Sequence, residues 1–113
     1  MNPAPSTFGA GSVRVAMMLG EVVHLGEVHR EWGRAATLLD DAFALAESHR
    51  LNVGIPRWET AQTLAVCWRM REWIARETDR GADATEAADH ARHFDEAADR
   101  EFAEAVEKGL LPA

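Results

Sequence analysis

The stretch RWETAQTLAVCWRMREWI, residues 57–74, decides how this chain folds, because apolar side chains recur at helical spacing on two of its sides. One broad apolar stripe contains Trp58, Leu64 and Trp68. A second apolar patch lies roughly opposite and consists of Val66, Met70 and Trp73. A helix that is apolar on two sides is either central in its own fold or covered on one side by a partner.

The segment before this stretch also has helical periodicity. Its apolar positions are Val15, Met18, Val22, Leu25, Trp32, Ala35, Leu39, Ala42 and Ala46. Glycines at 20, 26 and 33 each cost about 1 kcal/mol relative to alanine in a helix, and Gly33 marks where a break would fall. We nevertheless predict one continuous helix over about 13–50.

The segment RLNVGIPRW, residues 50–58, is the clearest helix breaker in the chain. Asn52 and Gly54 suit a helix end, and Pro56 suits the first turn of the next helix, where no amide donor is needed. We therefore expect a second helix from about 56 to 79, ending before Gly81.

The segment after Gly81 predicts a third, amphipathic helix over about 83–108. Asp83 and Glu86 have the spacing of an N-terminal capping box. Gly109 can take the left-handed conformation that closes a helix, and Pro112 prevents continuation.

These elements predict an all-α fold, a three-helix bundle in which a long helical hairpin carries the third amphipathic helix. No segment alternates as a strand would. We expect a single helical domain over 13–109, a flexible arm over 1–12, which is rich in Pro, Gly and Ser, and a short tail over 110–113.

The composition is that of an acidic globular protein. The 113 residues are 47% hydrophobic and 27% charged, with a formal net charge of −7, which argues against nucleic-acid binding as a function. Charge is uneven, because residues 56–80 hold five Arg against four acids, whereas residues 81–113 hold three basic and nine acidic residues. A second use of this acidic helix would be to mimic the charge of nucleic acid toward a basic partner.

The location we expect is the cytoplasm. The apolar segment VAMMLGEVVHLG, residues 15–26, is interrupted by Glu21 and His24 and is too short to cross a bilayer. The one cysteine, Cys67, excludes an internal disulfide and lies among apolar residues, which favours a buried thiol. Heavy use of alanine and arginine with a single lysine is typical of a high-GC genome, of a bacterium or of its phage.

A carboxylate–histidine metal site is the alternative chemical interpretation. Glu21 and His24 have the i, i+3 spacing by which di-iron helix bundles present their ligands. Glu72 and His90 on the later helices would complete a site for Fe or Zn. Di-iron bundles use two such Glu-x-x-His motifs, and this chain has one.

The interpretation we favour is a protein–protein interaction module that is not an enzyme and needs no cofactor. The sequence has no phosphate-binding glycine loop, no G-x-S-x-G and no H-E-x-x-H. Trp, Met and Arg are enriched at protein interfaces, so we predict a partner surface made of Val66, Arg69, Met70 and Trp73. The simplest partner is a second copy in a two-fold dimer. Packing of these side chains inside the chain's own core is the competing prediction. We expect a small regulatory, inhibitory or assembly factor.

Overall fold

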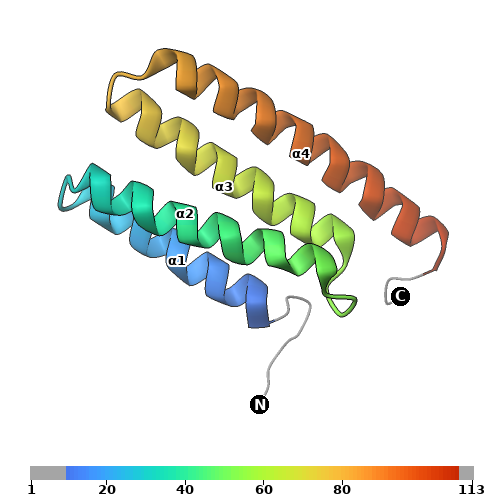
Figure 1. The fold of residues 1–113 in the computed structure, drawn as a ribbon. Coiled ribbons are helices and arrows are strands. Elements are labelled where there is room, and N and C mark those ends of the chain that lie inside the picture. The colour runs from blue at the N-terminus through green and yellow to red at the C-terminus, as the bar shows by residue number, and fades with distance from the viewer. Residues whose placement is uncertain (1–9, 110–113) are drawn as a thin grey trace.

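The computed structural model describes residues 10–109, which form four α-helices and no strand (Figure 1). The helices are α1 (Ala10–Glu27), α2 (Trp32–Ser48), α3 (Arg57–Glu77) and α4 (Gly81–Glu107), with a single 3-10 turn, η1 (His49–Leu51), after α2. They run alternately up and down, each beside the one before it. The predicted all-α bundle is confirmed.

The predicted continuous helix over 13–50 is wrong, because it is two helices. The chain turns back at residues 28–31, where Arg30 adopts a left-handed conformation with φ 56°. Carbonyl oxygens at the end of α1 accept hydrogen bonds from backbone amides of the turn. The distance is 2.9 Å from Glu31 N to Leu25 O and 3.2 Å from Arg30 N to Gly26 O. The turn lets the apolar stripes of the two halves pack against each other, which one straight helix cannot do.

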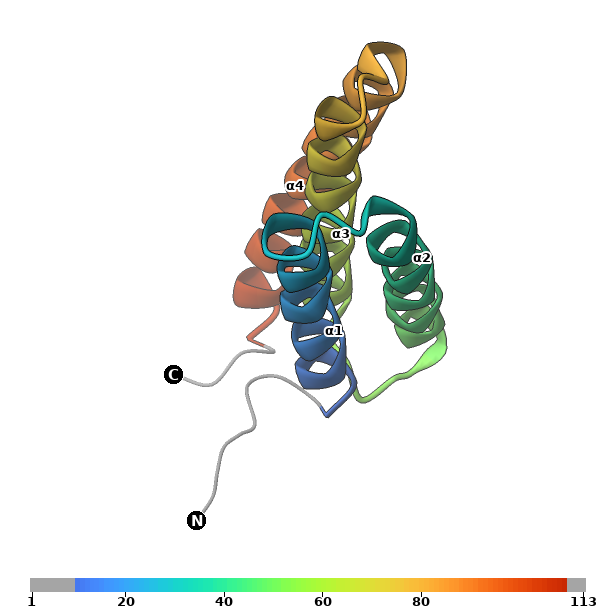
Figure 2. The same ribbon diagram turned by 90° about the vertical axis from the view of Figure 1, so that its left-hand side faces the viewer.

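α3 is the central helix of the bundle. The α1–α2 hairpin packs on one side of it and α4 packs along the other (Figures 1 and 2). Within residues 10–109, α4 packs extensively against α3 alone. Two apolar sides on α3 therefore correspond to two layers of neighbouring helices.

The main core lies between α1, α2 and α3. Its buried members are Val15, Leu19, Val22, Leu25, Ala35, Leu39, Ala42, Ala46, Leu64, Cys67 and Ile74. The α3–α4 contact is built differently, from small side chains. Its buried alanines are Ala61, Ala65 and Ala75 on α3 and Ala84, Ala87, Ala91, Ala97 and Ala98 on α4.

The predicted helix boundaries hold only in part. α4 begins at Gly81 with no side-chain cap, and Asp83 lies 3.6 Å from Arg80, so the capping-box prediction is wrong. Gly109 does close α4 with φ 69°. The last three residues of the predicted arm, 10–12, are helical, and the rest of the arm and the tail 110–113 lie outside the described residues. None of the helices described is long and apolar enough to cross a membrane.

Candidate functional site: an apolar face on α1 and the groove beside it

The predicted partner surface on α3 divides into a covered part and an open part. Met70 and Trp73 pack against the main core, and Trp73 meets Trp32 of α2 edge to face at 5.1 Å between ring centroids. A Cβ atom on Gly26 of α1 would lie 2.9 Å from the Trp73 ring. α1 and α2 thus cover this end of the patch, whereas Val66 stays 36% exposed. Of these three residues we keep only Val66 as a candidate for partner binding.

Arg69, the fourth residue of the predicted surface, points to the other layer of the bundle. Its guanidinium pairs with the carboxylate of Asp95 on α4, and both side chains are partly exposed. The pair links α3 to α4 across their edge. Arg69 and Val66 therefore have different neighbours and do not form one surface with Met70 and Trp73.

Within residues 10–109, an open apolar surface is centred on α1 rather than on α3. Val13 is 49% exposed and Met17 is 71% exposed, and Ala16 and Gly20 are exposed beside them. We call these four residues, Val13, Ala16, Met17 and Gly20, the α1 face. From residue 15 to residue 20 the helix carries no charged or polar side chain, so it is apolar on its outer side as well as on its core side. A helix of this kind normally has neighbours all round.

A groove runs between the α1 face and α3. It has a volume of about 510 Å³ and is lined by Val13, Val15, Ala16, Met17 and Leu19 of α1 and by Gln62, Thr63 and Val66 of α3. The lining is mostly apolar, with Gln62 and Thr63 as its polar members. Val66, the open part of the predicted patch, thus belongs to the same surface as Met17.

The sequence did contain a signal for this face. The segment VAMMLG, residues 15–20, is apolar in every position, although a helix with one buried side needs apolar residues on only one side. Val15 and Met18 of this segment belong to the predicted helical stripe, and its continuous apolar run was compared only with a membrane span. The outer side of α1 does not follow from its own sequence, because it depends on where α2 and α3 pack.

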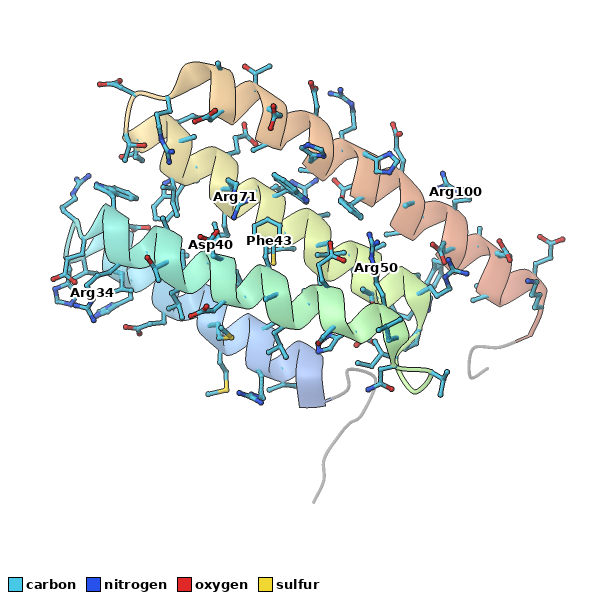
Figure 3. All side chains as sticks on the ribbon, in the orientation of Figure 1. Arg34, Asp40, Phe43, Arg50, Arg71 and Arg100 are labelled. Atoms are coloured by element: carbon cyan, nitrogen blue, oxygen red, sulfur yellow. The ribbon has the colours of Figure 1, made fainter. Side chains whose placement is uncertain are left out.

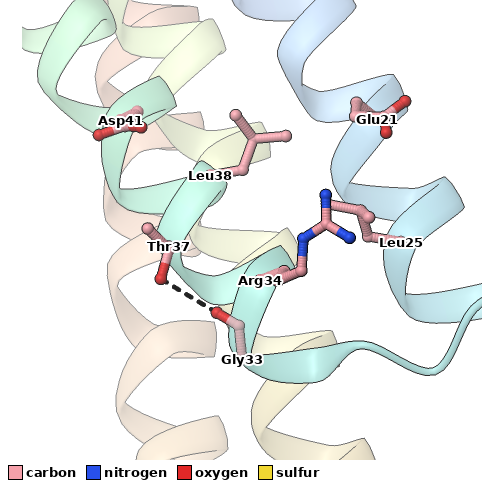
Figure 4. Close-up of a pocket in the computed structure, with 7 residues that line it drawn as sticks. All are labelled: Glu21, Leu25, Gly33, Arg34, Thr37, Leu38 and Asp41. Carbon is pink, nitrogen blue, oxygen red and sulfur yellow. Dashed lines mark hydrogen bonds between the residues drawn. The ribbon is translucent and has the colours of Figure 1, made fainter.

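A second hollow lies on the opposite flank of α1, between α1 and α2 (Figure 4). Its volume is about 360 Å³, and its polar members are Glu21, Arg34, Thr37 and Asp41. Arg34 extends from α2 toward α1 and pairs with Glu31 at 2.6 Å. The two flanks of α1 therefore differ, one apolar and facing α3, the other charged and facing α2.

The residues of the alternative metal site do not converge. Glu21 lines the charged hollow, and His24 contacts His29 with their Nε2 atoms 3.1 Å apart. Glu72 pairs with Arg76, and His90 stacks on Trp68. Among the residues that the structure describes, no three His, Cys, Asp or Glu side chains lie close enough together to hold a metal ion.

An aromatic–arginine cluster joins α2, α3 and α4. Trp68 stacks on His90 of α4 at 4.2 Å and meets Phe43 of α2 edge to face at 4.9 Å. Arg71 lies over Phe43 at 4.2 Å from its ring centroid and pairs with Asp40, as Figure 3 shows for the α2–α3 side. Stacked and cation–π contacts of this kind stabilise a structure by about 0.5–1.5 kcal/mol each. The cluster fixes α4 relative to α2, with which α4 makes little direct contact.

The acidic side chains of α4 are largely balanced by neighbouring cations. Five of them pair with arginine or lysine, namely Asp83, Asp89, Asp95, Glu101 and Glu104. The Lys108 ammonium, which bonds the Glu104 carboxylate, lowers the pKa of that carboxyl. This pairing leaves less uncompensated negative charge on α4 than the sequence count implies, which weakens the interpretation of α4 as a nucleic-acid mimic.

Cys67 is fully buried in the main core, as predicted. Burial raises the pKa of its thiol from 9.0 to about 11, despite the opposing charge of Arg71. Because thiolate is the reactive form, we expect a thiol reagent at pH 8 to label the folded protein at least ~100-fold more slowly than the urea-unfolded chain.

The same raised pKa gives a pH dependence of stability. The folded state holds the thiol proton more tightly than the unfolded state, so this contribution is complete below pH 9 and is lost as the pH rises toward about 11. Labelling with a chromogenic disulfide reagent at pH 8, with and without urea, measures how strongly folding slows the reaction of Cys67. Equal labelling rates in the two states would contradict the burial of Cys67.

Comparisons with protein-family models, with curated proteins and with solved structures found no match for this chain.

Proposed function

We propose that this protein is a small, acidic, non-enzymatic interaction module that acts by binding another protein through the α1 face and the adjoining groove. The observation that carries the proposal is the exposure of Met17 and Val13 beside a groove of about 510 Å³ lined mostly by apolar side chains. Contiguous apolar surface of this kind on a small domain is typical of an interaction site. A regulatory, inhibitory or assembly role fits a chain of this size.

Further exposed apolar residues lie at the same end of the bundle as the start of α1. Leu51 and Val53 follow α2, and Phe102 and Val106 lie near the end of α4. These segments and the start of α1 lie at the same end of the bundle (Figure 1). Val28, at the opposite end, is the exception, which makes it a useful control position.

The net charge of the chain and its single cysteine bear on the kind of partner and on the location that we propose. The net charge of −7 favours a protein partner over nucleic acid. A cytoplasmic location is part of the proposal, because a single buried thiol suits a reducing compartment.

The test is affinity capture with three versions of the full chain: wild type, Met17→Glu and Val28→Glu. Each variant replaces an exposed apolar side chain by glutamate, but only Met17 belongs to the α1 face. We expect Met17→Glu to lose at least ~90% of the captured partner, because a carboxylate buried in an apolar contact is strongly unfavourable. Val28→Glu should capture as wild type does. Equal capture by all three, with circular dichroism showing all three folded, would disprove the role of the α1 face.

A further inference from the structure

We infer that the partner of the α1 face is a second copy of this chain, bound with its α1 antiparallel to the first about a two-fold axis between Met17 and Met18. This inference rests on the proposed function and names its partner. Three features of α1 carry it: the placement of its charges, an exposed glycine, and an exposed methionine beside a groove.

The charges of α1 are arranged to complement themselves. Arg14 and Glu21 are equally distant from the midpoint between Met17 and Met18, on opposite sides of it. They are seven residues apart, close to two helical turns, so they lie on the same flank of the helix. Both are exposed, and within the part of the chain that the structure describes neither is ion-paired.

A two-fold axis at this midpoint uses both charges at once. In the second copy α1 runs in the opposite direction. The flank that carries Arg14 and Glu21 nevertheless lies on the same side of the contact in both copies. Arg14 of one copy therefore faces Glu21 of the second copy, and the reverse pair forms by symmetry. Opposite charges placed in this way fix the register of an antiparallel helix pair, whereas a parallel two-fold pair would leave the two charged flanks on opposite sides of the contact and unpaired.

Gly20 gives the second, independent argument. Glycine is unfavourable in the interior of a helix, and Gly20 lies inside α1. A Cβ atom added there would meet nothing within 4 Å, so no contact among the described residues requires a glycine at this position. Close approach of another backbone does require one. Across the proposed axis Gly20 lies nearly opposite Ala16 of the second copy, so two small residues meet on each side.

Met17 and the groove provide the third argument. Met17 projects from the α1 face with 71% of its surface exposed, next to a groove lined by Val66 and Thr63 of α3. Methionine is long and flexible and adapts to irregular apolar surfaces. A projecting side chain and an apolar groove on one surface are what an isologous contact needs, because each copy supplies both parts.

The test measures oligomeric state by sedimentation equilibrium for the full chain and for charge variants. We expect the wild type to dimerise, and Arg14→Glu and Glu21→Arg each to weaken the dimer at least about tenfold, because each creates two like-charge contacts. The double variant, Arg14→Glu with Glu21→Arg, should restore the wild-type dissociation constant. Val28→Glu is the matched surface control and should dimerise normally.

A second variant separates the contact from the fold. Gly20→Leu fits the open space around α1 and improves helix propensity, so the chain should stay folded while its dimer weakens at least about tenfold. Circular dichroism and thermal melting check that the chain is folded.

The contradicting outcomes are distinct from those of the capture experiment. A wild-type chain that stays monomeric at the highest concentration measured overturns the second-copy inference, as does failure of the double variant to restore the dimer. If Met17→Glu nevertheless abolishes capture of a different protein, the proposed function stands and the occupant is foreign. A dimer that tolerates both Gly20→Leu and Met17→Glu would show that the copies meet elsewhere.

Discussion

Replacing Trp73 by alanine is expected to lower the free energy of unfolding by about 3 kcal/mol, the lower end of the range for a buried tryptophan, because this ring is half-buried. The loss has a specific origin. Trp73 packs edge to face on Trp32 and lies over the backbone of Gly26, so one side chain joins α3 to the end of α1 and the start of α2. Urea unfolding followed by circular dichroism measures the change.

Val66→Ala is the matched control for this prediction. Val66 belongs to the same sequence patch but is exposed at the groove, so its replacement should change stability by less than about 1 kcal/mol. The proposed partner surface predicts that Val66→Ala weakens association instead. If Trp73→Ala left stability unchanged and abolished association, Trp73 would be a surface residue and the packing described here would be wrong.

Ala91→Asp is expected to detach α4 from the bundle. Ala91 is 3% exposed on the side of α4 that packs against α3, and both helices contribute buried alanines to this contact. Burying an unpaired charge there costs several kcal/mol. Within residues 10–109, α4 packs extensively against α3 alone, so its attachment depends mainly on this contact. Hydrogen exchange measured by mass spectrometry should show amides of residues 81–107 losing protection, while those of α1 and α2 keep most of theirs.

Ala103→Asp is the control for the detachment of α4. Ala103 lies on the exposed side of the same helix, so an added carboxylate stays in water and exchange should match the wild type. Uniform loss of protection across all four helices in Ala91→Asp would contradict the separate attachment of α4. It would instead indicate that the bundle unfolds as one cooperative unit.

The helix boundaries show where local sequence was sufficient. The helix break between residues 50 and 58 could be predicted from the sequence, because proline and glycine act through their own backbone preferences. The closing residue of α4, Gly109, was readable for the same reason. The turn at residues 28–31 was not, because it contains neither residue type and Arg30 adopts its left-handed conformation in a non-glycine context. At this turn the packing of α1 against α2 outweighs the free-energy cost of the left-handed conformation of Arg30.

The candidate site was harder to predict than the fold. Val66 was singled out with Met70 and Trp73 because the three share one side of a helical wheel. They differ in the structure because α1 and α2 cover one end of α3 more completely than its middle. The α1 face was missed because an apolar helix gives no internal sign of which side remains exposed.

The sequence by itself determined the all-α class, the presence of apolar residues on two sides of α3, and the burial of Cys67, since each depends on periodicity within one segment. Only the tertiary structure decided that α1 and α2 are separate helices, that α3 lies between α4 and the α1–α2 hairpin, that Trp73 packs against the main core, and that Met17 and Val66 share a groove. These depend on which helices become neighbours, and that choice follows from the free energy of burying all the apolar stripes together. No single helix encodes it.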